Sequence, residues 1–335
     1  MILTIIFLMI KIKPTITPIL EVIGMLVSPI IIGGFFYYAL RPLKKILLKL
    51  VKHSGIAAFL SILLVLVVIS VVIIYGGDIV IDQFEDAFVK NQDKLIEYKE
   101  YLDEKIQEIL PNLDILTRIS DNIKSFATSI SSNAMGIFSG IGNIGTQIVL
   151  IPFILFYLLK EDKLFKEKLF NIIPKNHKVE IKDMFIKTDS ILSTYINGQL
   201  LVALIIGVLM FIGYLIIGMP NALLMASFSL ITSIIPFIGP FLGVIPALLI
   251  ALTMNFGLVL KIIITAIIVQ QLEGNLITPN IMGNKLKIHP LAIILIVIIS
   301  IKLFGILGAF IGTPLYLTLV TIGKTIYSIS KKKKA

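Results

Sequence analysis

Long uninterrupted apolar runs are the feature that most limits what this chain can fold into. Several of them exceed eighteen residues, the length expected of a helix that crosses a bilayer. Hydrophobic residues make up 57% of the 335 residues, charged residues only 15%, and the mean hydropathy is +1.00. The period-two alternation of an outer-membrane barrel is absent from the sequence. The sequence therefore predicts an all-α polytopic membrane protein with about 6–8 transmembrane helices.

The basic residues lie in short segments between the apolar runs. Arg41 to Lys52 contains five basic residues and no acid, residues 160–187 hold eight lysines against five acids, and Lys331 to Lys334 are all basic. By the positive-inside rule, these three segments are expected on the cytoplasmic side of the cell membrane. We interpret the net charge of +10 as this orientation signal, and expect no nucleic-acid partner.

The charge and hydropathy patterns divide the chain into five parts. These are N-terminal transmembrane helices (1–77), an extracytoplasmic helical hairpin (78–132), a transmembrane helix (133–159), a cytoplasmic amphipathic linker (160–187) and a C-terminal transport core (188–335). The hairpin is predicted because residues 78–125 hold twelve acids against six bases and carry apolar residues every seven positions. It either packs on itself in solvent or forms a lid or assembly surface.

Residues 221–254 form an apolar stretch that is too long for one span. It is interrupted at Ile235 to Pro240, which leaves arms of about 15 residues. Pro236, Gly239 and Pro240 are predicted to make the tip of a hairpin. Such a re-entrant or short paired arrangement is tolerated because irregular backbone at membrane depth can be buried or can line a cavity.

Residues 288–323 form a second stretch of the same kind. Breaks are predicted near Lys302 to Gly305 and again at Gly312 to Pro314. The stretch again favours short or re-entrant helices that return to the side from which they start. Because such a hairpin does not change the side of the membrane on which the chain continues, the C-terminus can lie in the cytoplasm, in agreement with its lysines.

Glu273 is the only acidic residue among the last 146. The nearest charges, Lys261 and Lys285, are each twelve residues away, or roughly 18 Å along a helix. This spacing places Glu273 near the middle of a bilayer core ~30 Å thick. An ionisable group at that depth is costly, so Glu273 is a candidate coupling or substrate residue, with a structural partner role as the alternative.

Amide side chains and helix breakers surround Glu273. Because transporters bind cargo at polar, interrupted segments of this kind, Gln270, Gln271 and Asn275 are candidate ligands for a polar hydroxylated solute. The alternative is that they join helices through hydrogen bonds. Lys302 is the sole charge deep in its own apolar run, and a nearby ammonium favours the charged form of a carboxylate. We therefore predict that Glu273 and Lys302 act as a pair, with snorkelling of Lys302 as the alternative.

Several chemistries have no support in the sequence. There is no cysteine, and the histidines at 53, 177 and 289 fit no metal-ligand spacing, so no metal and no cofactor are expected. His289 precedes Pro290 and is interpreted as a cap or interfacial residue. No phosphate-binding Gly-x-x-x-x-Gly-Lys-Ser/Thr loop and no catalytic cluster is present, so an ATPase or another enzyme is not expected.

Six motifs occur in a fixed order along the chain. They are Tyr157-Leu158-Leu159-Lys160-Glu161-Asp162, Tyr195-x-x-Gly198-Gln199, Ile235-Pro236-Phe237-Ile238-Gly239-Pro240, Glu273-Gly274-Asn275 with Pro279 and Met282-Gly283, His289-Pro290, and Phe304-Gly305-Ile306-Leu307-Gly308 with Pro314. Together they resemble the autoinducer-2 exporter family, whose members are also described as permeases. The match covers most of the chain and is strongest from about residue 150 to the end.

The resemblance implies a multi-pass secondary transporter that forms homo-oligomeric rings, with the pentamer as the expected state. Members of the family have been linked to export of autoinducer-2 and to exchange of sodium or lithium for protons. Three functions therefore remain open: export of a small polar solute, monovalent cation/proton antiport, and a non-transporting membrane scaffold.

Overall fold

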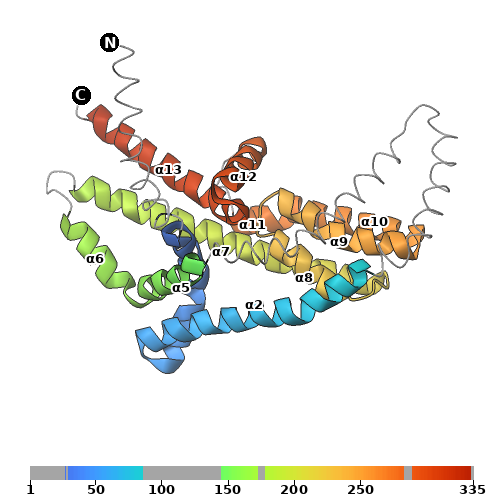
Figure 1. Ribbon diagram of the computed structural model, residues 1–335. Helices are drawn as coiled ribbons and strands as arrows, with labels where there is room; N and C mark the ends of the chain where they lie inside the picture. The colour runs from blue at the N-terminus through green and yellow to red at the C-terminus, as the bar shows by residue number, and fades with distance from the viewer. Residues whose placement is uncertain (1–26, 28, 86–144, 173–177, 283–288, 333–335) are drawn as a thin grey trace, which may run out of the picture. The chain divides into compact units, whose positions relative to one another are not determined.

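The regular secondary structure of the computed structural model is helical throughout the residues that it describes (Figure 1). These are residues 27, 29–85, 145–172, 178–282 and 289–332. Within them, three helical segments are long and apolar enough to cross a bilayer: Lys178–Ile216, Phe256–Met282 and Gly308–Ser328. Shorter apolar helices accompany them. This arrangement confirms the predicted all-helical, polytopic membrane protein.

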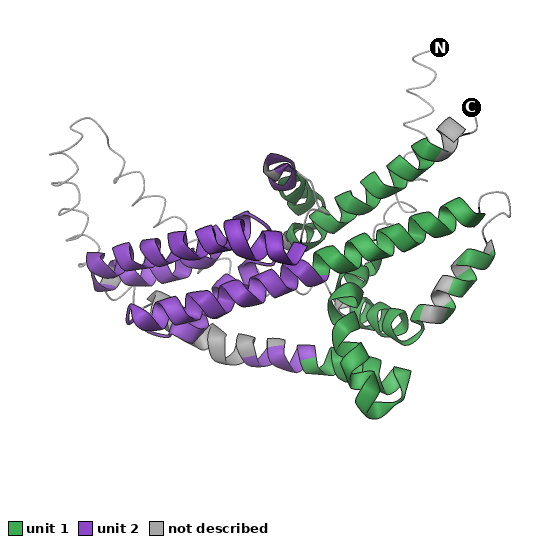
Figure 2. Cartoon of the chain, turned by 180° about the vertical axis from the view of Figure 1, so that it is seen from behind, with its two compact units in different colours: residues 1–64, 144–196, 296–335 green, residues 65–143, 197–295 purple. Residues whose placement is uncertain are grey.

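The chain forms two compact units, which Figure 2 colours separately. Unit 1 comprises residues 1–64, 144–196 and 296–335, and unit 2 comprises residues 65–143 and 197–295. Three helices each contribute residues to both units: α2 (Ser54–Glu85), α7 (Lys178–Ile216) and α12 (Pro290–Phe304).

Unit 1 is built around a helix over residues 29–51, together with α5 (Gly145–Lys160) and α6 (Asp162–Ile172). Gly33 permits a close approach to α5, because a Cβ added there would lie 3.1 Å from the Ile154 Cγ2. A turn at Lys52, which has a positive φ of 59°, leads from the first helix into α2. Remaining parts of unit 1 come from α7, α12 and α13 (Ile306–Lys332).

Several predicted segment borders lie inside continuous helices. The helix over residues 29–51 continues past Arg41, α2 continues through Gly76 and Gly77, and α7 begins at Lys178, before the border placed at residue 187. Lysine and glutamate are good helix formers, so a rise in charge does not by itself end a helix, and α2 continues despite the low helix propensity of Gly76 and Gly77. Most of the predicted hairpin (78–132) lies outside the described residues, and its location stays a prediction.

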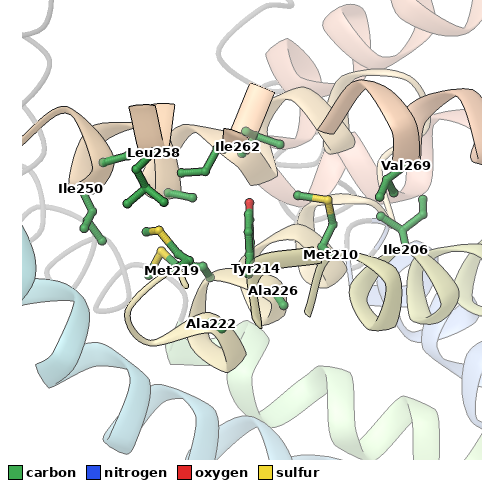
Figure 3. Packing of buried hydrophobic residues seen from close by; sticks show 14 of the residues in the cluster. Ile206, Met210, Tyr214, Met219, Ala222, Ala226, Ile250, Leu258, Ile262 and Val269 are labelled. Atoms are coloured by element: carbon green, nitrogen blue, oxygen red, sulfur yellow. The ribbon is translucent and has the colours of Figure 1, made fainter. Parts of the chain in front are cut away.

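The core of unit 2 consists of the second part of α7 packed with α8 (Ala222–Thr232), α9 (Ile238–Met254) and α10 (Phe256–Leu272). Figure 3 shows Tyr214 of α7, fully buried, between Met219 and Met210. Gly218 has a φ of 73°, and its N–H and that of Met219 donate to the carbonyls of Leu215 and Tyr214. This Schellman turn ends α7 and reverses the chain into α8.

The α8–α9 hairpin turns at residues 233–237, which overlap the break predicted at Ile235 to Pro240, and Gly239 and Pro240 lie in the first turn of α9. Its arms contain 11 and 17 residues, or about 16 and 25 Å of helix, so both are shorter than the hydrocarbon core. Phe237 has a φ of 63°, and Gly239 lies directly against the backbone of Thr232. A turn this tight requires a residue without a Cβ at 239.

The second apolar stretch turns once. α12 ends at Phe304 and α13 begins at Ile306, with Gly305 at a φ of 63° between them. The second break predicted at Gly312 to Pro314 was wrong, because α13 continues through Pro314. A proline removes only one helical hydrogen bond, and neighbouring helices and side chains can compensate in a membrane helix. The Thr318 hydroxyl donates to the Pro314 carbonyl at 2.9 Å.

Candidate functional site

The helix that carries Glu273 changes its hydrogen-bond pattern at that residue. α10 passes directly into a π-helical turn, η3 (Glu273–Ile277), and then into α11 (Thr278–Met282). The N–H of Thr278 donates to the carbonyl of Glu273, five residues earlier. Pro279 has no N–H to donate, so one hydrogen bond of the helix is missing just after this turn. The predicted interruption is therefore a π-turn and leaves the helix continuous, a feature frequent at functional sites.

The Glu273 side chain lies at a small pocket inside unit 2. Residues of α7, α8, α9, α10 and η3 line it: Ile206, Met210, Ser229, Pro240, Val244, Ala266, Val269, Gln270 and Glu273. Figure 3 shows three of the apolar lining residues, Ile206, Met210 and Val269, at one end of the core. The volume of the pocket, about 10 Å³, is close to the minimum that one water molecule requires.

One oxygen of the Glu273 carboxylate is not satisfied. Its Oε2 is buried and has no hydrogen-bond partner among the residues that the structure describes. A buried polar atom without a partner is uncommon in proteins and calls for an explanation such as a bound ion, a water or a functional role. The only other polar side chains that line the pocket are those of Gln270 and Ser229. The Ser229 hydroxyl already contacts the carbonyl of Gly243 at 3.0 Å.

The structure divides the predicted polar cluster into two groups. Gln270 lies one helical turn from Glu273 and lines the same pocket. Gln271 and Asn275 are exposed, and the Asn275 Nδ2 donates to the Gln271 Oε1 at 2.9 Å. Only Gln270 is thus brought to the pocket with Glu273.

The tip of the α8–α9 hairpin is tied to α7 by Gln199. Its Nε2 donates to the buried carbonyl of Ser233 at 2.8 Å, immediately after the last residue of α8. This bond satisfies a carbonyl that the end of a helix leaves without a partner. Pro240 follows on α9 and reaches the Glu273 pocket, whereas Pro236 lies within the turn. Gln199, absent from our predicted site residues, is thus linked to the hairpin that helps to form the pocket.

Lys302 and His289 lie at the two ends of α12. Lys302 is in the last turn and its side chain is exposed, a position where the partial negative charge of the helix C-terminus stabilises a cation. It belongs to unit 1, whereas Glu273 belongs to unit 2, so their pairing stays a prediction. The Nδ1 of His289 accepts a hydrogen bond from the N–H of Leu291 at 3.3 Å. This contact confirms the interpretation of His289 as a cap.

A charged cluster in unit 1 was not predicted as a site. Arg41 Nη1 donates to both carboxylate oxygens of Asp189 at 3.2 Å, and Arg41 Nη2 lies 3.7 Å from the Asp162 Oδ2. The hydroxyls of Tyr37 and Tyr38 donate to Asp162 at 2.6 Å and to Asp189 at 3.0 Å. The cluster joins the helix over residues 29–51 to α6 and α7. One sequence signal was available: Arg41 is one of only two arginines in the chain.

The end of α5 is held by the same first helix and by α2. Lys44 Nζ donates to the carbonyl of Leu159 at 2.6 Å, and the Ser54 hydroxyl donates to the carbonyl of Lys160 at 3.0 Å. These carbonyls lie in the last turn of α5, where helical partners are lacking. The motif that runs from Tyr157 to Asp162 therefore forms the junction between helices in unit 1.

Comparison with known proteins decides the family. The model of the family described as AI-2E family transporter matches residues 1–328. The chain belongs to the AI-2E transporter family. Among its relatives, "Putative transport protein YueF" of Bacillus subtilis is 31% identical over 326 residues, which cover 94% of this chain and 88% of that protein. This extent shows that the likeness is not confined to the apolar helices.

Two further relatives of this AI-2E family member match shorter regions. "Putative transport protein YrrI" of Bacillus subtilis is 35% identical over 200 residues, or 59% of this chain and 57% of that protein. "Putative permease PerM" of Escherichia coli K12 is 26% identical over 213 residues, or 62% of this chain and 60% of that protein. The family and these relatives are named for transport, so the chain is a multi-pass membrane protein of a transporter family.

Proposed function

We propose that this AI-2E family member is a secondary transporter that exports a small polar solute, with an autoinducer-2-like molecule as the first candidate. In this proposal Glu273 carries the coupling proton, and Gln270 and Ser229 complete its polar surroundings. The solute class rests on the family's name and on the polar residues around Glu273.

The observation that carries the proposal is the unpartnered oxygen of Glu273 in a pocket of about 10 Å³. A carboxylate at this site can accept or release a proton, or hold one water-sized species, without displacing an existing hydrogen bond. The same pocket is far smaller than the ~300 Å³ at which small-molecule sites begin. Glu273 is therefore proposed as the coupling site, and a solute requires a different conformation of the surrounding helices.

Cation/proton antiport is the second candidate. A single carboxylate beside a helix irregularity can bind either a proton or a monovalent cation, as in transporters with discontinuous helices. The pocket favours this reading in one respect, because its volume suits an ion-sized occupant. If neither solute nor ion moves, the third function, a membrane scaffold that transports nothing, is the one supported.

Flux measurements in proteoliposomes test the proposal. Labelled autoinducer-2 movement that depends on a proton gradient supports export, and sodium- or lithium-driven proton movement without solute flux supports antiport. Glu273→Gln is expected to assemble normally and to lose coupling to protons. Gln270 lines the pocket, so Gln270→Leu should impair flux. The matched control Gln271→Leu changes an exposed amide and should leave flux unchanged. Normal coupled transport by Glu273→Gln would refute the role of Glu273.

We further propose that Glu273 and Lys302 act on each other during transport. Removing one member of an ion pair leaves the other charge uncompensated. Lys302→Met should therefore reduce proton-coupled flux less when Glu273→Gln is already present than it does by itself. The measurement is a double-mutant cycle on proton-coupled flux with Glu273→Gln and Lys302→Met. Strictly additive effects would show that the two residues are not a working pair.

We also propose the orientation and assembly of the chain. Residues 78–132 lie outside the cytoplasm, and residues 41–54, 160–187 and the C-terminus lie inside, in a cell membrane. A homo-oligomer, by family resemblance a pentamer, is the proposed assembly. Because the chain has no cysteine, Ser131→Cys provides a single labelling site. Its modification by a membrane-impermeant reagent added to intact cells is expected, and modification only from the cytoplasmic side would overturn the orientation.

A further inference from the structure

A groove in unit 1 lies between α5 and α6, the two green helices joined at the turn around Glu161 (Figure 1). Its volume is about 290 Å³, at the lower end of small-molecule sites and far larger than the Glu273 pocket. The lining residues are Phe153, Ile154, Tyr157, Leu158, Glu161, Leu164 and Lys168.

The wall of the groove is apolar and remains accessible. Phe153 is 59% exposed, Tyr157 43% and Leu164 53%. Ile154 and Leu158 continue the same wall along α5. Phe153 and Tyr157 lie one helical turn apart with ring centroids separated by 4.9 Å, so they present a continuous aromatic surface. The shape and chemistry of this wall suit an alkyl chain.

The opening of the groove carries positive charge. Lys168 of α6 lines it with an exposed side chain. Glu161 is the one acidic lining residue, and its Oε1 lies 3.8 Å from the Lys160 Nζ. That ammonium also lies over the ring of Tyr157, 5.7 Å from its centroid. The acid is therefore locally balanced, which leaves the charge of Lys168 available to an anion.

We propose that this groove binds an anionic phospholipid, with part of one acyl chain along α5 and the phosphate at Lys168. The aromatic wall provides the apolar contact, and an amphipathic surface that combines Lys with Phe, Leu and Tyr is typical of membrane interfaces. A phospholipid without net charge places its own cation near Lys168 and gains less.

The test uses the absence of tryptophan from the chain. Phe153→Trp in the full-length protein creates a single fluorescent reporter in the groove. In bilayers that contain brominated phosphatidylglycerol or brominated phosphatidylcholine, quenching reports which lipid occupies the site. We expect about a fivefold preference for phosphatidylglycerol, since one lysine near an anionic surface contributes about that factor. A control reporter, Phe241→Trp on α9, tests ordinary lipid contact and should show no such preference.

Two charge variants distinguish the groove from general surface attraction. Lys168→Glu in the reporter protein should abolish the preference for phosphatidylglycerol, with Lys168→Gln as a milder second variant. Lys182→Glu makes the same change in charge on α7, outside the groove, and should leave the preference intact. Equal quenching by both lipids, an unaffected Lys168→Glu protein, or an equal loss in Lys182→Glu would overturn the proposal. Absence of quenching by either lipid would also overturn it, because protein and not lipid would then fill the groove.

An apolar pair of variants tests the acyl-chain contact. Leu164→Gln should weaken quenching by both lipids, because it places an amide in the wall of the groove. Val179→Gln, at a 78% exposed position of α7 outside the groove, is the matched control and should have no effect. Both positions are exposed, so neither change is expected to prevent folding. Unchanged quenching in Leu164→Gln would contradict the acyl-chain contact.

Discussion

Gly239 at the start of α9 is the position where a single methyl group should do most harm to the α8–α9 hairpin. A Cβ added there would lie 2.5 Å from the Thr232 carbonyl carbon and 2.8 Å from the Ser233 Cα, and closer still to the Thr232 oxygen. All three are backbone atoms. No rotation of a side chain can relieve the overlap, so the turn itself would have to open.

The size of the effect follows from these distances. Carbon atoms in contact are normally about 3.5–4.0 Å apart, so the backbone must move by about 1 Å or more. Overpacking of this kind costs typically about 1–3 kcal/mol. For a chain of 335 residues, that is expected to lower the melting temperature by roughly 1–4 °C. Flux should fall as well, because Pro240, the next residue, lines the Glu273 pocket.

The melting temperature of purified Gly239→Ala in detergent, monitored by size-exclusion chromatography after heating, measures this loss of stability. Gly323→Ala is the matched control, since Gly323 lies inside α13 and an added Cβ would meet nothing within 4 Å. There the same substitution should stabilise the helix, by about 0.5–1 kcal/mol. If Gly239→Ala unfolds at the same temperature as the unmodified protein or above it, the argument from backbone contact is wrong.

Three further changes test other contacts by the same thermal measurement. Arg41→Met removes the cation shared by Asp162 and Asp189 and should cost about 1–3 kcal/mol of stability. This cost is below that of breaking a fully buried pair, because these side chains are partly exposed. Its control, Lys187→Met, breaks an exposed pair with Asp183 and should change stability by less than about 0.5 kcal/mol. Gln199→Leu leaves the buried carbonyl of Ser233 without its donor and should cost about 1–3 kcal/mol, whereas no loss would show that the bond is dispensable. Gly213→Ala should destabilise through overlap with the methyl group of Thr265, and adding Thr265→Ser, which removes that methyl, should restore stability; failure of this rescue would point to a different cause.

The sequence was sufficient to predict the fold class and the place of the first hairpin. Apolar runs of membrane length leave the helix as the dominant solution, because it satisfies its own backbone hydrogen bonds. Pro236, Gly239 and Pro240 interrupt such a run with residues that favour a turn, and the structure turns between Thr232 and Ile238. Glu273 was identifiable because an acid surrounded by apolar sequence is rare.

The same local reasoning failed where helices continue through unfavourable residues. Pro314 looked like a break, yet α13 passes through it, and the helix that carries Glu273 continues through a π-turn and then through Pro279 without a break. Whether a proline ends a helix depends on the neighbours that satisfy the released backbone groups. Those neighbours lie far away in the sequence, so hydropathy and propensity do not contain the answer.

The composition of the site was decided by tertiary structure. Sequence spacing grouped Gln270, Gln271 and Asn275 with Glu273, but helical geometry turns Gln270 towards the pocket and leaves the other two amides exposed. Ser229 reaches the pocket from α8, more than forty positions away in the sequence. The sequence alone determined that a costly carboxylate lies deep in an apolar run. Packing determined which groups surround it, because helices distant in the sequence supply most of the pocket wall.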